Sequence, residues 1–382
     1  MKRLRIAVGP QERGTRMGEL LRNAARHVRN VALTGLRAVG GFNRIADSSW
    51  RRRRLLILCY HGVSLQDEHE WNPELFVTRA FLRRRFEILR DKGYVVLPLD
   101  ESLARCMNGT LPPRSVVMTF DDGLSDFAQL AAPLLVEFGF PATVYVTTYY
   151  SEKQWPVVPP ILGYLLWKAG ERLRAFEWPA AGIQGMARDD LPTLQRQVFA
   201  QLDHFANDRA MSGYERWELT QSLADRLGVD LGTILRRRTL HIMTSDEIRA
   251  VASQGVDVQL HTHRHRVPRD AALFEAEILE NRHRLEALTG RKAEHFCYPS
   301  GVVFRECLPW LRRLGVRSAV TCESGLYPPS GNPLLVPRFI DTSAQSEVVF
   351  ESWLSGASAA LLVGDRSMLH IGVDGGRGYK AA

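Results

Sequence analysis

From residue 55 onward, short apolar runs alternate with amphipathic segments of helical periodicity. In the first half of the chain, the apolar runs that predict strands cover residues 55–60, 94–97, 115–120 and 142–147. Between them, residues 81–89 and 127–138 have apolar positions three and four residues apart, which predicts helices, and Gly93 and Gly139 follow as helix ends. This alternation predicts repeated βα units and a parallel sheet.

The same rhythm returns after residue 240. Thr244 and Glu247 have the spacing of a capping box, which predicts a helix start, and Gly255 predicts its end. Three further strands and one long helix are predicted at residues 256–260, 295–298, 316–321 and 273–288. We therefore expect an α/β fold with its functional groups at the carboxyl ends of parallel strands, where α/β barrels and open sheets place them.

Residues 150–240 interrupt this alternation with mostly helical sequence rich in Arg and Leu. Four of the eight tryptophans fall here, at positions 155, 167, 178 and 217. Their irregular spacing is more typical of a helical core than of a sugar-stacking face, so we expect an inserted helical subdomain. The predicted layout is a basic, partly helical N-terminal arm at 1–54, a main domain at 55–345 that contains the insertion, and a C-terminal tail at 346–382.

The formal net charge of +8 is concentrated in the N-terminal arm. Residues 1–54 hold 14 Lys or Arg against three acidic residues, whereas the rest of the chain is close to neutral. Apolar positions at 17–32 recur at helical spacing with arginines between them, which fits either a peripheral membrane helix or a solvated helix packed on the main domain. No nucleic-acid partner is expected, because the remainder is near neutral and carries no recognition motif.

The chain shows no pattern of a transmembrane or secreted protein. It has no run of about 18 apolar residues, and its first residues lack the apolar segment of a secretory signal. We therefore expect a cytoplasmic protein, with peripheral contact to the inner membrane as the role open to the basic arm. The five cysteines are scattered, odd in number and without C-x-x-C spacing, which predicts reduced core residues.

Two short motifs stand directly after predicted strands. Thr-Phe-Asp-Asp-Gly occupies 119–123, where Gly123 permits a tight turn, and His-Thr-His-Arg-His occupies 261–265. Either motif alone is weak, because Asp-Asp-Gly is also common turn chemistry. Placed at the ends of two parallel strands, however, they form a matched set of metal ligands.

These residue types suit the hydrolysis of an amide, which needs an activated water, a polarised carbonyl and a proton for the departing amine. One divalent metal supplies the first two. His261 and His265, together with Asp122, offer imidazole and carboxylate ligands and leave coordination positions open for water and substrate. Asp121 is then available as the general base. His263, midway between the two converging imidazoles, is expected to point elsewhere.

With these two motifs the chain resembles the polysaccharide deacetylase family with a NodB-type domain, carbohydrate esterase family four, over about residues 55–345. The family's T-F-D-D-G motif is whole at 119–123, and its H-[ST]-x-x-H motif is whole at 261–265. The resemblance implies a distorted (β/α)7-type barrel with the site at the strand C-termini. It also implies that Asp121 is the catalytic base.

The resemblance further implies a carbohydrate substrate and a bound divalent metal. Zn²⁺ is the expected ion, with Co²⁺, Ni²⁺ or Fe²⁺ as alternatives. The positions that match the family's metal ligands are Asp122, His261 and His265.

The third family motif departs from its usual Arg-x-Pro-Tyr-Gly form and appears as Cys-Tyr-Pro-Ser-Gly at 297–301. By position, the backbone N–H of Ser300 is expected to contribute to an oxyanion hole, and Tyr298 to line the substrate site. The missing arginine usually orients the catalytic base. Arg338 is a candidate substitute, with a structural arginine at a strand end as the equally weighted alternative.

The family's late histidine, its general acid, has no clear match. His370 comes after the point where the barrel should close, and His61, in Cys-Tyr-His-Gly at 59–62, is placed to line the pocket. The expected function is removal of N-acetyl groups from an N-acetylated sugar, polysaccharide or glycan precursor. The alternatives are an O-acetyl esterase acting on carbohydrate and a catalytically inactive carbohydrate-binding protein.

Overall fold

The computed structural model describes residues 28–185 and 190–362. Within these residues eight strands form one parallel sheet in the order β10-β1-β5-β6-β7-β8-β9, and β4 pairs with β5 beside β6. Their bounds are β1 Leu56–Tyr60, β4 Val95–Val96, β5 Ser115–Phe120, β6 Thr143–Val146, β7 Asp257–Leu260, β8 His295–Cys297, β9 Ser318–Val320 and β10 Phe339–Ile340. Two further short strands, β2 Gly62–Val63 and β3 Phe76–Val77, pair in parallel with each other.

The sheet curls until one short segment joins its two edges. Val336 makes a parallel bridge to Val320 at the end of β9, and three residues later Phe339 pairs with Leu58 of β1. The segment 336–341 therefore lies between the first and last strands of the curl. The predicted fold, an α/β distorted barrel with a helical insertion, is confirmed.

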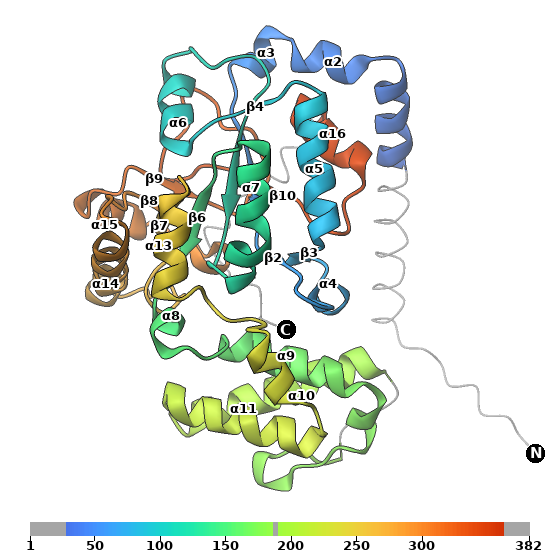
Figure 1. Cartoon of the computed structure of the whole chain (residues 1–382), viewed down its shortest axis with the longest axis vertical. Helices are drawn as coiled ribbons and strands as arrows, with labels where there is room; N and C mark the ends of the chain where they lie inside the picture. The colour runs from blue at the N-terminus through green and yellow to red at the C-terminus, as the bar shows by residue number, and fades with distance from the viewer. Residues whose placement is uncertain (1–27, 186–189, 363–382) are drawn as a thin grey trace, which may run out of the picture.

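Helices follow most strands and cover the outside of the sheet (Figure 1). They are α5 Arg79–Asp91, α6 Leu99–Met107, α7 Ala132–Phe138, α13 Ser245–Ser253, α14 Ala271–Thr289, α15 Cys307–Arg313 and α16 Glu347–Ser355. Helix α13 begins with the predicted capping box, in which Thr244 accepts from the backbone of Glu247 and the Glu247 side chain accepts from the backbone of Thr244. One turn of π-helix, Phe127–Ala131, precedes α7.

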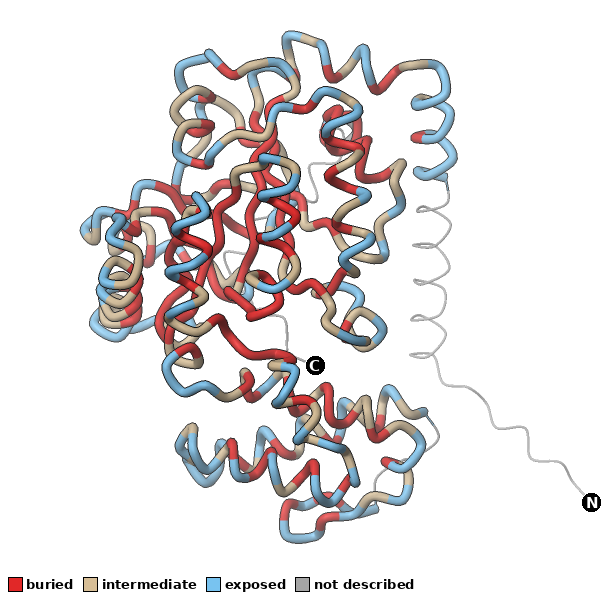
Figure 2. The backbone as a smooth tube through the Cα atoms, viewed as in Figure 1, coloured by how far each residue is buried: buried red, intermediate tan, exposed pale blue. Residues whose placement is uncertain are grey.

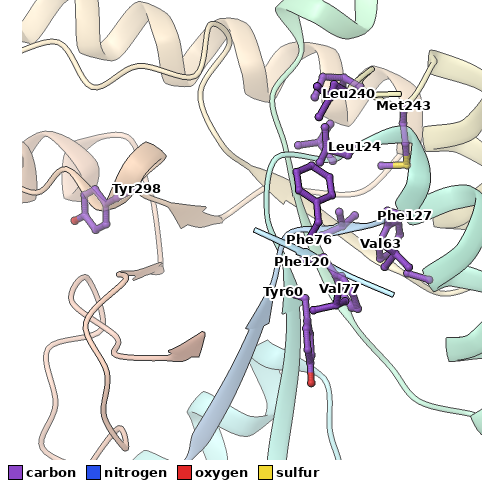
Figure 3. Packing of buried hydrophobic residues seen from close by; sticks show 14 of the residues in the cluster. Tyr60, Val63, Phe76, Val77, Phe120, Leu124, Phe127, Leu240, Met243 and Tyr298 are labelled. Carbon is purple, nitrogen blue, oxygen red and sulfur yellow. The ribbon is translucent and has the colours of Figure 1, made fainter. Parts of the chain in front are cut away.

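The strands are buried along almost their whole length, as expected for a parallel sheet covered by helices (Figure 2). At the carboxyl end of β1 and β5, Tyr60 stacks on Phe120 with ring centroids 5.5 Å apart, and Phe120 meets Phe127 edge-on at 4.9 Å (Figure 3). Full burial of one such side chain stabilises the fold by about 1.5–3 kcal/mol. This packing supports the turn that follows β5.

The insertion forms a helical layer of its own beside the sheet, reached through α8, Tyr149–Lys153, directly after β6 (Figure 1). Its other helices are α9 Val158–Ala169, α10 Leu191–Asp208, α11 Gly213–Leu227 and α12 Leu231–Arg236, with 3-10 turns at Gly170–Ala175 and Pro179–Ala181. Trp178 and Trp217 are buried, and Trp155 and Trp167 pack against the same core, in agreement with the predicted core role.

The N-terminal arm is not separate from the main domain over its described part. Residues 28–38 are helical, and α2 Gly41–Ala46 and α3 Ser49–Arg52 follow. Arg51 is 1% exposed and donates hydrogen bonds to the carbonyls of Leu354 and Ser115, at 3.1 and 3.2 Å. These carbonyls satisfy the hydrogen bonds of the guanidinium inside the protein.

The predicted C-terminal tail likewise begins with structure, because α16 is followed by α17, Ala357–Leu362. In α16, Phe350 and Leu354 are fully buried. Most of the predicted amphipathic segment at 17–32 and all of the tail beyond 362 lie outside the described residues. Among the residues that the structure describes, no helix has the length and apolar character needed to cross a membrane.

Candidate active site

The first motif forms a tight turn at the end of β5. The backbone N–H of Asp121 donates to the carbonyl of Tyr60 at 2.9 Å, which continues the pairing of β1 with β5 by one residue. Asp122 and Gly123 then adopt left-handed backbone angles, with φ of 70° and 75°. A Cβ at Gly123 would lie 2.8 Å from a methyl group of Val146, so both the angle and the close approach require glycine. The turn directs the two carboxylates apart.

The second motif turns back at the end of β7. Thr262 and His265 have left-handed φ angles of 61° and 53°, which are uncommon for residues with a Cβ and strained for a β-branched one. The hydroxyl of Thr262 accepts from the backbone N–H of Arg266 at 3.1 Å and closes the turn. As a result, the rings of His261 and His265 lie 4.9 Å apart.

Three ligand atoms from the two motifs converge. Oδ1 of Asp122 lies 3.0 Å from Nε2 of His261 and 3.1 Å from Nε2 of His265. One ligand atom from each of the three residues lies within 4.8 Å of the others. Two imidazoles and one carboxylate at this spacing suit a borderline divalent metal with coordination positions left open. The structure thus brings together the three residues predicted as metal ligands.

Neighbouring groups fix the orientation of His261. Its Nδ1 lies 2.9 Å from the carbonyl of Cys297, so the ring donates there and presents Nε2 to Asp122. Its backbone N–H donates to Oδ1 of Asn281 in α14 at 2.9 Å. The amide of Asn281 in turn donates to the carbonyl of Val146, at 3.0 Å. One buried side chain therefore links the ends of β6 and β7.

His263 points away from this group, as expected. Its Nδ1 lies 2.9 Å from the hydroxyl of Thr148, and its Nε2 faces Glu280 at 3.4 Å. Its backbone is held by Glu277, which is 1% exposed and whose carbonyl accepts from the N–H of His263 at 3.1 Å. His263 is therefore part of the support of the turn.

Asp121 is bound by Arg338 in a bidentate salt bridge. Nη1 and Nη2 of the guanidinium lie 2.7 Å from Oδ1 and Oδ2 of the carboxylate, and both side chains are almost fully buried. Arg338 also donates to the hydroxyl of Thr119 at 3.0 Å and to the carbonyl of Thr321 at 3.0 Å. Arg338 thus occupies the position expected of a substitute for the missing family arginine.

Electrostatics keep both aspartates ionised. Burial alone would raise the pKa of Asp121, but the charge and hydrogen bonds of Arg338 outweigh it and hold that pKa well below its ordinary value. Burial opposes ionisation of Asp122 as well, yet hydrogen bonds from His261 and His265 bring its pKa well below the usual range. Burial lowers the pKa of His265, but the hydrogen bond and charge of Asp122 raise it overall.

His61 and two thiols complete the surroundings of Asp121. Nε2 of His61 lies 3.7 Å from Oδ2 of Asp121, and its side chain is 14% exposed. The sulfurs of Cys59 and Cys297 lie 3.5 and 3.3 Å from the same oxygen. Although Cys59, His61 and Asp121 have the spacing of a metal site, both oxygens of Asp121 are already bound to Arg338. They are therefore poor ligands for a second ion.

The third motif is placed less favourably for its predicted roles. Tyr298 is fully buried and lies away from the aromatic cluster of Tyr60 and Phe120 (Figure 3). Its hydroxyl donates to the carbonyl of Leu334 at 2.9 Å. Its side chain therefore does not line a substrate site. Ser300 is exposed and has a left-handed φ of 54°, so its backbone N–H remains the candidate oxyanion donor. His370 lies outside the described residues.

Sequence reasoning missed the two buried polar residues of α14 that hold the histidine turn. Glu277 and Asn281 stand four residues apart on the same helix face as Ile278 and Leu285, which belong to the core. Polar residues within an apolar helical stripe are costly to bury unless they are hydrogen-bonded. Two polar residues within an otherwise apolar helical stripe were therefore the sequence feature that could have identified Glu277 and Asn281.

Comparisons with known proteins agree with the site. The sequence profile of the polysaccharide deacetylase family matches residues 108–182 and 219–319, which contain both motifs. Poly-β-1,6-N-acetyl-D-glucosamine N-deacetylase of Escherichia coli K12 is 30% identical over 99 residues, which is 26% of this chain and 14% of that protein. The chain thus matches only a small part of this relative's length.

Two solved structures share the fold over most of the chain. The Streptococcus pyogenes deacetylase PplD, in complex with acetate, is 18% identical, with a TM-score of 0.52 over 78% of this chain and 96% of the other. A de-N-acetylase from Aggregatibacter actinomycetemcomitans is 15% identical, with a TM-score of 0.50 over 78% and 99%. The family profile, the two intact motifs and the curled parallel sheet together show that the chain belongs to the polysaccharide deacetylase family.

Proposed function

We propose that the chain is a metal-dependent hydrolase that removes N-acetyl groups from an N-acetylated carbohydrate. The observation that carries the proposal is the convergence of Asp122, His261 and His265 beside one buried ion pair, the ionised Asp121 held by Arg338. The relative in Escherichia coli is named for N-deacetylation of a polymer of N-acetylglucosamine. An N-acetylated sugar is therefore the first substrate class to test.

The donor set supports a bound divalent ion. Asp122, His261 and His265 would hold it through one carboxylate oxygen and two Nε2 atoms, and Zn²⁺ is the first ion to test because it favours this ligand set. A divalent ion in this position supplies Lewis acidity that polarises the acetamide carbonyl and activates water. The Nδ1 contact of His261 to the carbonyl of Cys297 keeps its Nε2 free for this role.

Asp121 is the residue suited to accept a proton from the attacking water. Its pKa lies well below the ordinary value because the charge of Arg338 outweighs the effect of burial, so the carboxylate is ionised at every pH near neutrality. The bidentate contact also prevents the carboxylate from rotating. Arg338 thus fixes both the charge and the direction of the base, at the expense of some basicity.

Two further groups complete the proposed reaction. In this proposal the backbone N–H of Ser300, an exposed residue with a left-handed φ of 54°, donates to the oxyanion that forms from the carbonyl. His61, partly exposed beside Asp121, orients the acetamido group. The proton that Asp121 accepts from water passes to the amine nitrogen as the C–N bond breaks, and acetate and a free amino sugar leave.

The test is acetate release by the purified full chain from a panel of N-acetylated sugars, with Zn²⁺ or Co²⁺ supplied. We expect Asp121→Asn to keep its metal and lose acetate release by about 100-fold or more, since general-base catalysis contributes roughly 10²–10⁴. His265→Ala should lose both metal and activity. The matched controls are Asp203→Asn and His283→Ala, which change exposed residues of α10 and α14.

Each arm has a contradicting outcome. A wild-type protein that binds metal but releases no acetate from any N-acetylated sugar would overturn the proposed activity. Release from O-acetylated sugars alone would reassign the reaction to an ester. Metal content in His265→Ala equal to that of His283→Ala would overturn the ligand assignment.

A further inference from the structure

A cavity of about 270 Å³ lies between the insertion and the barrel. Its walls come from α9, the turn between α11 and α12, and the loop that precedes α4, Glu68–Trp71. Polar side chains that line it include Gln66, Lys168, Arg172, Asp230, Thr233 and Arg237. We call it the insertion cavity. Because pockets for whole drug-sized ligands span roughly 300–1,000 Å³, this volume suits one small group rather than a glycan chain.

The acidic groups at the insertion cavity are already engaged. Asp67, just outside it, forms a salt bridge with Lys168 and accepts a hydrogen bond from the hydroxyl of Tyr164. Asp230 caps α12 by accepting from the backbone N–H of Thr233 at 2.9 Å. Lys168 and Asp67 therefore cancel, and Asp230 is turned toward its own helix.

Two arginines at the same cavity lack a carboxylate partner. Arg172 donates to the carbonyls of Gly228 at 2.8 Å and Lys168 at 3.2 Å, which carry no charge. Arg237 is exposed and forms no ion pair with any residue in the described ranges. Burial and Asp67 raise the pKa of Tyr164 well above its ordinary value, and the charge of Arg237 opposes part of this rise, as expected for a cation near the same space. The cavity is therefore positively charged.

The wall of the insertion cavity is continuous with the catalytic turn. Thr239 lines the cavity, and the segment around it packs on the residues that follow Asp122. The backbone N–H of Ser125 donates to the carbonyl of His241 at 2.7 Å, and the N–H of Met243 donates to the carbonyl of Gly123 at 2.9 Å. These two hydrogen bonds connect the segment that follows Thr239 directly to the turn that carries Asp122.

We propose that the insertion cavity binds a phosphoryl or carboxylate group carried by the sugar that the active site deacetylates. Guanidinium groups present planar pairs of N–H donors that match such oxyanions, and Arg172 and Arg237 approach from two different elements. The inference rests on the proposed function for the identity of the sugar. The insertion then selects charged substrates, and the barrel performs the reaction.

The test is calorimetric binding to the full-length protein, which needs no turnover. The probes are N-acetylglucosamine 6-phosphate, glucuronic acid, neutral N-acetylglucosamine and inorganic phosphate. We expect one or both charged sugars to bind at least tenfold more tightly than the neutral one. Their affinity should fall as the salt concentration is raised. The two charged probes distinguish a phosphoryl from a carboxylate ligand.

Arg237→Gln should weaken binding of the charged sugar by about tenfold and leave binding of the neutral sugar unchanged, because it removes a hydrogen bond between two charged groups. Arg237→Lys, which keeps the charge, should restore part of the affinity. Arg196→Gln is the matched control, since Arg196 is an exposed arginine of the insertion that does not line the cavity. Melting temperatures of all variants are compared with wild type, and Arg237 is exposed, so its replacement should leave folding intact.

Equal affinity for charged and neutral sugars would overturn the inference, as would unchanged binding in Arg237→Gln. Inorganic phosphate that binds as tightly as the sugar phosphate, and in competition with it, would identify a free-anion site and also overturn it. Acetate release is measured separately. Its absence would refute the proposed activity, while charge-dependent sugar binding through Arg237 would still stand.

Discussion

The salt bridge between Asp121 and Arg338 joins residues 217 positions apart and is buried at both ends. Breaking such a pair by removing one partner leaves an uncompensated charge and typically costs about 3–5 kcal/mol. We therefore expect Arg338 to affect both the stability of the fold and the proposed reaction. The two effects separate by their dependence on pH.

For Arg338→Met we expect the pKa of Asp121 to rise, since the effect of burial is then opposed only by the smaller effects of His61 and His261. In wild type the lowered pKa means that the pair stabilises the fold above the ordinary value of 3.8, and that this contribution disappears only as pH falls through the still lower folded-state pKa. The variant should lose about 100-fold in kcat/KM at pH 6 and recover partly at higher pH. Acetate release measured from pH 5 to 9 tests this.

Arg85→Met is the matched control for this variant. Arg85 is also buried and bound to a buried aspartate, with Nε 2.9 Å from Oδ2 of Asp341. Arg85→Met should lower the melting temperature by about as much as Arg338→Met does. The fall of kcat/KM on the acid side of the pH profile, the acid limb, should stay at the pH where the wild type shows it. An acid limb that moves equally in both variants would show that Arg338 has no specific effect on Asp121.

The residues that sequence alone could identify are those in contiguous motifs. Asp122, His261 and His265 are each within five residues of a strand end, so local spacing was enough to propose that they converge. The role of Arg338 stayed open between a substitute cation for Asp121 and a structural arginine, because Asp121 lies far away along the chain. The side chain of Tyr298 could not be placed, since its burial depends on how the segment ending at Leu334 packs over it.

At the scale of elements, α14 supports the histidine turn through Asn281. This side chain accepts from the backbone of His261 and donates to the carbonyl of Val146 and to the hydroxyl of Thr148, at 3.0 and 3.1 Å. All these groups are buried. The helix therefore sets the distance between the ends of β6 and β7.

We expect Asn281→Ala to lower the free energy of unfolding by about 1–3 kcal/mol, because it leaves buried backbone groups without partners. Metal affinity should fall by about 10–100-fold, as for other residues that orient metal-binding histidines. Chemical denaturation and titration with Zn²⁺ measure the two effects. Asn207→Ala, at an exposed position of α10, is the control, and equal metal affinity in both variants would refute the role of Asn281.

Most elements were predictable from periodicity because strands and helices have distinct repeats. The strand predicted at 115–120 coincides with β5, and the helix predicted at 273–288 differs from α14 by two residues at its start and one at its end. The segment 127–138 was predicted as one helix, but it begins with a π-turn. Hydrophobic spacing does not distinguish these two hydrogen-bonding patterns over a single turn.

At the scale of the whole molecule, charge separates the chain's N-terminal region from the rest. Residues 1–27 carry seven Lys or Arg against two acidic residues. Beyond them, residues 28–38 form a helix that exposes Val28 and Val31, which are 68% and 59% accessible. A basic segment next to exposed apolar side chains is typical of peripheral binding to anionic membranes. We propose this contact at the inner face of the membrane for a cytoplasmic protein.

We expect the full chain to co-sediment with vesicles that contain anionic lipid, and less so at 0.5 M salt, where charges are strongly screened. Removing residues 1–27 should reduce the bound fraction severalfold, because each basic residue near such a surface contributes about 1 kcal/mol. The truncation ends before Arg51, so the packed part of the chain is retained. Equal sedimentation of both proteins, or binding to neutral vesicles alone, would contradict the proposal.

Arg338 lies on the same segment, 336–341, that joins the first and last strands of the curl. Synthesis from the N-terminus makes Asp121 and both histidines before residue 338. The curl of the sheet and the charge balance around Asp121 are therefore completed by the same late segment of the chain.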